Sequence, residues 1–390
     1  APRAAPVRIA PGERAGVPLV LTGTNGETVF WRASAPPGVS VSPARGTATA
    51  NAPVMLNVAA APGLQPHAFP VRVQGEAANG ARLIAQELPV IVAAPGASVP
   101  LAYVPNYSDN TVTVFDPATG ALVQTLGVGH NPGDAQMSAD GTRVYVADQG
   151  SNDISVIDTA SRTVISAVKT GKVPATLRLA PDGKSAWVSD YADNTIQRID
   201  LSTLRAGAPI AVGRAPQQLA ISPDGSTVYV VNQNDNTVSV VDAGSSKAVA
   251  TIPVGARPGG IVLSADGRTA YVGNQGSNSV TPIDLASRTP LPAIDAGVQP
   301  QGLVLSPDGA ALYVADGGSD TVSVLDLRRR VRRQSMRVGL NPVALALSRD
   351  GRTMYAVLLG DNACVKFSID DPRIRSTVEM GNAPLAIALP

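Results

Sequence analysis

The sequence feature that most constrains the fold is a segment copied at a fixed interval of 42 residues. The segment YVVNQNDNTVSVVD starts at Tyr229 and returns in altered form at the same spacing. Its opening aromatic residue occurs at Tyr103, Tyr145, Trp187, Tyr229, Tyr271, Tyr313 and Tyr355. A repeat of this length is one supersecondary unit that cannot bury its apolar face alone, so neighbouring copies must pack on each other.

Other positions keep the same register. A Gly-x-x-Pro loop occurs once in every unit, from Gly129 to Gly381, and an Asp-Gly pair recurs six times, from Asp140 to Asp350. Seven units of 42 residues account for 294 of the 390 residues and leave 96 at the N-terminus. The constant positions are therefore interpreted as scaffold, and the positions that vary between copies are free to serve a function.

A single unit reads as four short strands. In residues 217–255, the apolar or alternating runs LAIS, TVYVVN, TVSVVD and KAVATIPV are separated by the turns PDG, QNDN and AGSS. Asp, Asn and Gly accept the backbone angles that tight turns require. Four antiparallel strands in about 40 residues are typical of a β-propeller blade. The sequence predicts an all-β, seven-bladed propeller, whose closure removes exposed sheet edges.

The two ends of the repeat region also predict closure. The final segment PLAIALP, residues 384–390, aligns with the first strand of a unit and stops before the Asp-Gly turn. The repeats begin near Leu101 with a second strand. We expect the C-terminal strand to complete the blade that residues 102–104 begin.

Residues 1–95 lack the repeat and read as about seven short strands between Gly- and Pro-rich turns. This pattern predicts an immunoglobulin-like β-sandwich domain over 1–95, followed by the propeller over 96–390. Trp31 is expected in the sandwich core, and residues 93–100 are the expected linker.

Composition excludes several classes. Hydrophobic residues make up 44% of the chain, and no run of 18 apolar residues occurs, so a folded protein without a membrane-spanning helix is expected. Lys and Arg total 31 against 30 Asp and Glu, which gives no argument for nucleic-acid binding. Two histidines and the single Cys364 do not build a histidine- or thiolate-rich metal centre. We expect no cofactor and no metal ligand set of this kind; carboxylate-ligated calcium in the channel or loops is the alternative, although no twelve-residue EF-hand loop is present. We expect Cys364 in the core.

The repeated segment resembles the motif of the YVTN-repeat β-propellers, which are proteins of the periplasm and cell surface. It reads Tyr103-Val-Pro-Asn, Tyr145-Val-Ala-Asp and Tyr229-Val-Val-Asn, and the resemblance covers roughly residues 97–390. The seventh copy, Tyr355-Ala-Val-Leu, lacks the polar fourth residue. Residues 37–43 are similar to a segment of small bacterial Ig-like surface modules. The resemblance implies a periplasmic, secreted or cell-surface protein whose signal peptide has been removed.

The loops between blades and the turns within them predict a ligand site at one mouth of the channel. His130, Lys172, Arg214 and Arg257 occupy one sector of the loops. Four varying turn positions accompany them: Tyr107, Gln149, Tyr191 and Gln233. Asp134 and Arg178 interrupt the apolar inner strands. Such groups suit a polar or anionic ligand, or an acidic loop of a partner; the alternative is a solvated rim.

A second basic stretch is LRRRVRRQSMR, residues 327–337, in a turn and an outer strand. Its arginines predict an anionic surface partner, or else protection of a sheet edge. The arginines considered for that partner are Arg328, Arg329, Arg330, Arg332 and Arg333.

Three function classes fit these features. The favoured one is a non-enzymatic, extracytoplasmic binding or scaffold protein, because no P-loop or HExxH motif is present. The second is a lactonase- or lyase-like enzyme, which would need His130, Asp134 and Arg178 to converge. The same enzyme class includes a propeller subunit of an oxidoreductase complex. The third is a structural module of a multi-protein assembly, with the rim of the propeller as its docking surface.

Overall fold

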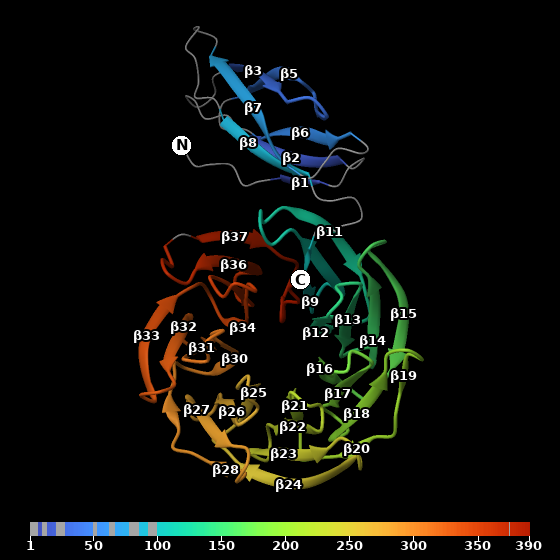
Figure 1. Cartoon of the computed structure of the whole chain (residues 1–390), viewed down its shortest axis with the longest axis vertical. Coiled ribbons are helices and arrows are strands. Elements are labelled where there is room, and N and C mark those ends of the chain that lie inside the picture. Colours follow the sequence, from blue (N-terminus) through green and yellow to red (C-terminus); the bar gives the residue numbers. More distant parts are fainter. Residues whose placement is uncertain are drawn as a thin grey trace. The chain divides into compact units, whose positions relative to one another are not determined.

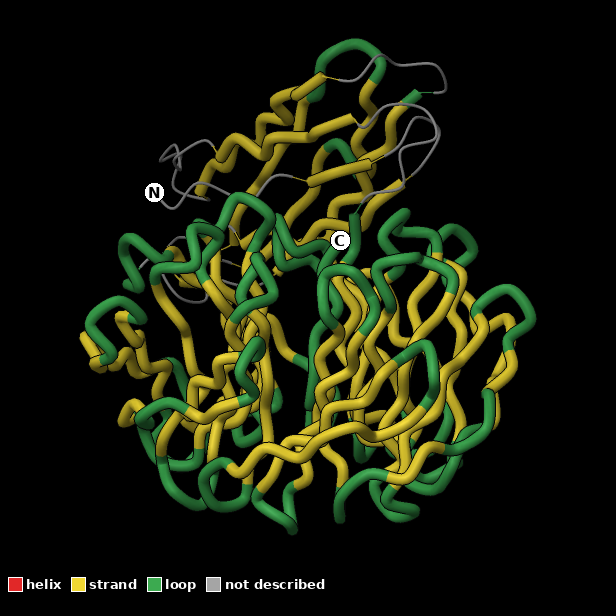
Figure 2. The backbone as a smooth tube through the Cα atoms, turned by 60° about the horizontal axis from the view of Figure 1, so that its bottom comes forward, coloured by secondary structure: helices red, strands yellow, loops and turns green. Residues whose placement is uncertain are grey.

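The computed structural model describes residues 7–9, 14–20, 28–49, 53–61, 67–77, 86–92, 100–373 and 375–390. The chain divides into two compact units, Ala1–Leu101 with Asp116–Ala121, and Ala102–Phe115 with Leu122–Pro390. The described residues form strands and turns (Figure 2), and none of them forms a helix that is long and apolar enough to cross a membrane.

The first unit holds eight described strands in two sheets. One sheet has the order β1-β8-β7-β3-β5 and the other the order β2-β6-β4. Their bounds are β1 Val7–Ile9, β2 Arg14–Val20, β3 Thr28–Ser34, β4 Val39–Ser42, β5 Arg45–Thr49, β6 Pro53–Ala60, β7 His67–Ala77 and β8 Gln86–Val92. Trp31 is buried, as predicted. The expected linker at 93–100 lies outside the described residues except for Pro100.

The strand β5 was not predicted, because RGTAT offers no apolar alternation. It forms by pairing with β3, and Gly46 lies opposite Trp31. A Cβ at Gly46 would approach the indole ring to 2.9 Å, so glycine lets the backbone cover the tryptophan.

The described part of the second unit forms seven sheets, one for each repeat, named sheets 1 to 7 below. Sheet 1 holds β9 (Ala102–Asn106), β10 (Thr111–Phe115) and β11 (Leu122–Gly127). Sheet 2 holds β12 (Pro132–Met137), β13 (Arg143–Asp148), β14 (Asp153–Asp158) and β15 (Thr163–Lys169). Sheet 3 holds β16 (Pro174–Leu179), β17 (Ser185–Asp190), β18 (Thr195–Asp200), β19 (Arg205–Ala206) and β20 (Ile210–Ala211).

Sheets 4 to 7 continue the pattern. Sheet 4 holds β21 (Pro216–Ile221), β22 (Thr227–Asn232), β23 (Thr237–Asp242) and β24 (Lys247–Pro253). Sheet 5 holds β25 (Pro258–Leu263), β26 (Thr269–Asn274), β27 (Ser279–Asp284), β28 (Thr289–Pro290) and β29 (Ile294–Asp295). Sheet 6 holds β30 (Pro300–Leu305), β31 (Ala311–Asp316), β32 (Thr321–Asp326) and β33 (Val331–Arg337). Sheet 7 holds β34 (Pro342–Leu347), β35 (Thr353–Leu358), β36 (Ala363–Ser368) and β37 (Arg375–Glu379).

These sheets follow one another around a common axis in sequence order, with β12, β16, β21, β25, β30 and β34 innermost (Figure 1). The C-terminal segment lies against β9, where the amide of Ala388 donates to the carbonyl of Tyr103 at 2.9 Å. A regular strand was predicted here. The structure shows two isolated bridges instead, at Pro384 and Ala388. Proline has no N–H, so Pro384 cannot donate to a ladder.

The outer strand is split in two of the sheets. In sheet 3 the interruption between β19 and β20 contains Gly207 and Pro209, and in sheet 5 the residues after β28 include Pro292. Glycine weakens a strand and proline withholds a donor, so both interruptions follow from composition.

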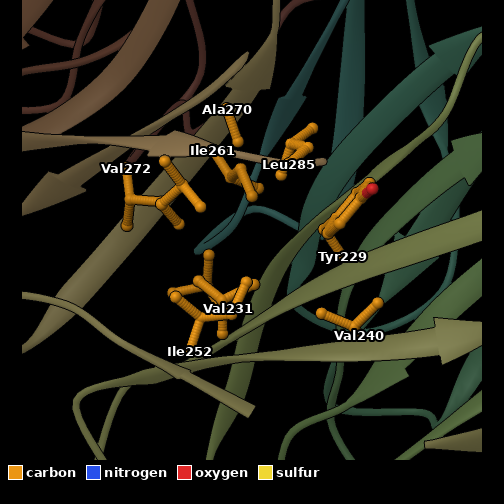
Figure 3. Close-up of a cluster of buried hydrophobic side chains, with 10 residues drawn as sticks. Tyr229, Val231, Val240, Ile252, Ile261, Ala270, Val272 and Leu285 are labelled. Atoms are coloured by element: carbon orange, nitrogen blue, oxygen red, sulfur yellow. The ribbon is translucent and has the colours of Figure 1, made fainter. Parts of the chain in front are cut away.

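Apolar side chains hold neighbouring sheets together. Tyr229, Val231 and Val240 of sheet 4 form one buried cluster with residues of sheet 5 that include Ile261 and Val272 (Figure 3). Six of the seven repeated aromatic residues are buried in this way among the described residues. Burial of one such side chain stabilises the fold by about 2–3 kcal/mol, which explains why the aromatic position recurs.

The fourth residue of the repeated motif is a buried polar group that shapes the loop beside it. Asn232 donates from Nδ2 to Thr237 Oγ1 at 3.0 Å and to Ser239 Oγ at 2.9 Å. A Cβ at Gly213 would lie 2.5 Å from the Asn232 side chain. Each Gly-x-x-Pro glycine has the same relation to the fourth residue of a motif. In sheet 7 the fourth residue is Leu358, and it still pairs with Ala363 across the turn.

We expect Gly213→Ala to destabilise the protein by about 1–3 kcal/mol, because the new methyl group must displace the buried Asn232 side chain. Equilibrium unfolding in urea measures this change. The matched control is Gly127→Ala, where a Cβ meets nothing within 4 Å and the change should stay within about 0.5 kcal/mol. Equal losses in the two variants would contradict the packing argument.

Candidate functional site

A central cavity of about 330 Å³ lies along the axis of the second unit. Its wall is built from the innermost strands of sheets 2 to 7 and from the C-terminal segment at Leu385, Ala386 and Ile387. Because six of the seven sheets contribute, the side chains that vary between copies decide what the cavity can hold.

One ion pair dominates the polar part of this wall. Arg178 Nη1 on β16 lies 2.7 Å from Asp134 Oδ2 on β12, so the pair joins two adjacent inner strands. The Leu177 amide donates to the same carboxylate oxygen at 3.0 Å. Burial raises the pKa of Asp134, and the charge of Arg178 opposes that shift. Nε and Nη2 of Arg178 have no hydrogen-bond partner among the described residues and can donate to a ligand.

Glutamine amides line the cavity next to this pair. Gln149 and Gln275 occupy the space beside Gly133 and Gly259, where a Cβ would collide with each amide. In sheet 6 the arrangement is exchanged: Gln301 comes from the inner strand, and glycine stands at position 317. Each of these three sheets therefore places one glutamine amide beside the cavity. The amide comes either from the turn after the second strand or from the innermost strand.

The wall is divided into a polar and an apolar part. Sheets 2 to 4 contribute Asp134, Gln136, Thr176, Arg178, Gln217 and Gln218. Sheets 5 to 7 and the C-terminal segment contribute Ile261, Val262, Leu303, Val343, Leu345, Leu385 and Ile387. Sheets 5 and 6 also contribute the amides of Gln275 and Gln301. Since the sheets follow one another around the axis, the ion pair and most of the polar residues gather on one side of the cavity, and the aliphatic residues gather on the other side beside these two amides.

Three of the predicted site residues line this cavity: Asp134, Arg178 and Gln149. Three others lie outside the lining. The Tyr191 hydroxyl donates to Gln233 Oε1 at 3.4 Å, and Gln233 is buried. Tyr107 is partly buried, and its carbonyl accepts a hydrogen bond from Asn131 Nδ2.

The four predicted loop cations do not join the cavity. His130, Lys172, Arg214 and Arg257 are exposed and are not part of its lining. Their backbone amides are held by turn side chains, such as Asp193 for Lys172. Arg214 is further engaged by Asp235 through Nε at 2.6 Å. The loops therefore fix the backbone and send these side chains into solvent.

The polar residues Gln218 and Gln301 were missed as site residues. The available signal was the inner-strand column that contains Asp134, because Gln218 stands 84 residues after Asp134 in the same register. Its Oε1 accepts the Ile261 amide at 3.3 Å, as Asp134 accepts the Leu177 amide. Gln301 stands in the neighbouring inner-strand column, 84 residues after Gln217.

Comparison with known proteins agrees with the architecture. Residues 76–293 match the YNCE-like beta-propeller family. The chain belongs to this propeller family. No match was found among the curated proteins.

Three solved structures share the propeller fold. A chain of the hydrazine synthase of Kuenenia stuttgartiensis is 24% identical with a TM-score of 0.64, over 68% of this chain and 91% of that one. A functionally unknown protein of Desulfotomaculum acetoxidans is 19% identical with a TM-score of 0.65, over 74% and 98%. A candidate 6-phosphogluconolactonase of Bacteroides fragilis is 17% identical with a TM-score of 0.62, over 76% and 99%.

Two other carboxyl groups of this propeller have strongly raised pKa values. The pKa of Asp148 and the pKa of Asp190 are each raised to about 7, chiefly because burial disfavours the ionised form. Both stand at the fourth position of the repeated motif and outside the cavity lining. Neither oxygen of Asp190 forms a well-aligned hydrogen bond, although the Gly171 amide and the Thr195 hydroxyl lie close enough to oppose the shift.

We expect Asp190→Asn to flatten the pH dependence of stability. The folded pKa of Asp190 is about 7 and its ordinary value is 3.8, so the unfolded chain loses this proton first. The contribution of Asp190 therefore decreases as pH rises from about 4 to about 7 and is constant above that range. Asparagine, which sheets 4 and 5 carry at this position, should raise stability at about pH 8 by about 1–3 kcal/mol.

Urea unfolding at about pH 5 and at about pH 8 measures this effect. The control is Asp200→Asn on β18, because hydrogen bonds from Ser202 and Thr203 lower the pKa of Asp200 to about 2. That ionised carboxylate stabilises the folded state above its ordinary pKa, so its substitution should lower stability at both pH values. A pH profile unchanged by Asp190→Asn would contradict the assignment.

Proposed function

We propose that this chain is a non-enzymatic binding protein that holds an amphiphilic organic anion in the channel of its propeller. In this proposal the seven sheets are the blades of a ring closed by the C-terminal segment, and the first unit is an Ig-like sandwich. The two-sheet arrangement of the first unit and the hydrogen bonds between Ala388 and Tyr103 support these assignments.

The observation that carries the proposal is the two-sided wall of the cavity. The polar side offers the unused N–H groups of Arg178 together with the amides of Gln217 and Gln218. A guanidinium group presents donors in the planar arrangement that a carboxylate accepts. The opposite side offers aliphatic side chains such as Leu303 and Leu345, beside the amides of Gln275 and Gln301. A small carboxylate with an apolar body matches both sides, whereas a sugar leaves the aliphatic side unused.

Binding is favoured over catalysis because the carboxylate of the cavity is already engaged. Asp134 is the single carboxylate in the lining and accepts hydrogen bonds from Arg178 and from the Leu177 amide. A general acid or base needs a proton-accepting atom within reach of the substrate. His130, which the enzyme alternative requires at this place, is outside the lining. We place the protein outside the cytoplasm on its resemblance to periplasmic and surface propellers, and fractionation of the native host tests this placement.

Calorimetric titration with octanoate tests the proposed ligand class. We expect octanoate to bind and glucose not to bind. Arg178→Gln should weaken octanoate binding by about tenfold or more, because the anionic head loses its guanidinium partner. The matched control is Arg198→Gln on β18, an arginine that pairs with Asp182 outside the cavity and should leave binding unchanged.

A second variant tests the apolar side separately. Leu303→Gln should weaken octanoate binding and leave acetate binding unaffected, since acetate has no chain to bury. Thermal unfolding verifies that each variant is folded. Octanoate binding that persists unchanged in both Arg178→Gln and Leu303→Gln would overturn the proposal, as would equal binding of glucose.

A further inference from the structure

The outermost strand of sheet 6 carries an unusual concentration of arginine. Arg332, Arg333 and Arg337 lie on β33, and three more arginines occupy the turn that precedes it. All of them are exposed. The whole chain has a net charge of only +1, so this strand is a local excess of positive charge.

Neighbouring carboxylates neutralise only part of this charge. Arg329 pairs loosely with Asp326 at 3.8 Å, and Arg337 with Asp320 at 3.9 Å. Within the described part of the chain, Arg328, Arg330 and Arg333 form no ion pair. A hollow of about 410 Å³ adjoins the strand, and Arg328, Arg329 and Arg333 line it together with Tyr313 and the carboxylates of Asp308 and Asp326. Several guanidinium groups are thus free to take carboxylate partners.

Protection of the sheet edge does not account for six arginines, because other outer strands provide an internal comparison. The outer strand β11 carries no charged residue and exposes Leu122 and Val123, and β15 and β24 carry one lysine each. These strands occupy the equivalent edge of the same fold. The outer strand β37 carries one charge of each sign, at Arg375 and Glu379. Among the described sheets no other undivided outer strand carries more than one positive charge, so the arginines of sheet 6 need another explanation.

The strand itself offers a second kind of contact. β33 pairs with β32 on one side and is last in its sheet, so its other edge presents main-chain N–H and C=O groups. It runs over seven residues with one bulge at Arg333, and it is not divided in two as the outer strands of sheets 3 and 5 are. An extended peptide can add to such an edge through main-chain hydrogen bonds.

We propose that β33 is a docking edge for an acidic, extended segment of a partner protein. The main-chain groups of the edge bind the partner backbone, and Arg328, Arg330 and Arg333 bind its carboxylates. A nucleic acid would engage the arginines but would leave the main-chain groups of the edge without partners. Peptide recognition uses both features, so the partner is a protein segment rather than a polynucleotide.

Fluorescence anisotropy with labelled synthetic peptides of about eight residues tests this docking edge in the full chain. The probe alternates Glu and Val; the matched control peptide alternates Glu and Pro and has the same charge. Its prolines remove every second N–H group and fix φ at about −65°, away from the φ of an antiparallel strand. We expect the Glu-Val peptide to bind at least about tenfold more tightly than the Glu-Pro peptide. A Lys-Val peptide should not bind.

The protein variant for this test is the triple charge reversal Arg328→Glu, Arg330→Glu and Arg333→Glu, which should abolish binding of the Glu-Val peptide. Arg375→Glu on the outer strand β37 is the control and should leave binding intact. Circular dichroism and thermal unfolding verify the fold of both variants. Equal binding of the two acidic peptides, binding that survives the triple reversal, or tighter binding of a DNA oligonucleotide than of the Glu-Val peptide would overturn the proposal.

Discussion

One hydrogen bond, made seven times, links each sheet of the propeller to the next. A turn residue, asparagine in six copies and Asp320 in the other, accepts the backbone amide of a residue 21 positions later through Oδ1. In the fourth copy, Asn236 accepts the amide of Arg257 at 2.8 Å. Both partners have left-handed backbone angles, with φ of 58° at Asn236 and 48° at Arg257. Asparagine tolerates that conformation better than other side chains do, which explains its recurrence.

This link divides the 42-residue period into two halves of 21 and sets the distance between successive sheets. The last copy joins Asn362 to Ala383 and so holds the C-terminal segment beside sheet 7. Because the link uses only the backbone of the loop residue, that residue's side chain is unconstrained. Valine, arginine and glutamine all occupy the position, at Val173, Arg257 and Gln299. The hydrogen bond between sheets therefore does not depend on the side chains that differ between copies.

The repeats could be recognised in the sequence because their constant positions hold the local backbone in place. The aromatic position, the Gly-x-x-Pro loop and the turn asparagine each have a local cause, so the period revealed the strands and the burial of Cys364. The features that the sequence did not predict depend on contacts between distant parts of the chain and have no such local cause. β5 exists through pairing with β3, and the loop cations extend into solvent because nothing near them accepts their charge inside the cavity. Arg178 could be recognised because it interrupts the apolar pattern of an inner strand. Its pairing with Asp134 could not be predicted, because it depends on the distance between two inner strands.

Negative and positive charges are distributed differently along the repeats of this protein. Many aspartates are repeated turn residues, such as Asp224, whose pKa is lowered to about 2 by hydrogen bonds from Ser222 and Ser226. They recur with the period and therefore spread negative charge evenly over the seven sheets. The basic residues follow no period: Lys172 and Arg214 lie in the loops of neighbouring sheets, and the arginines of β33 lie in one sheet only. A nearly neutral chain consequently has positive sectors at particular sheets, and those sectors, not the net charge, determine where anionic partners are attracted.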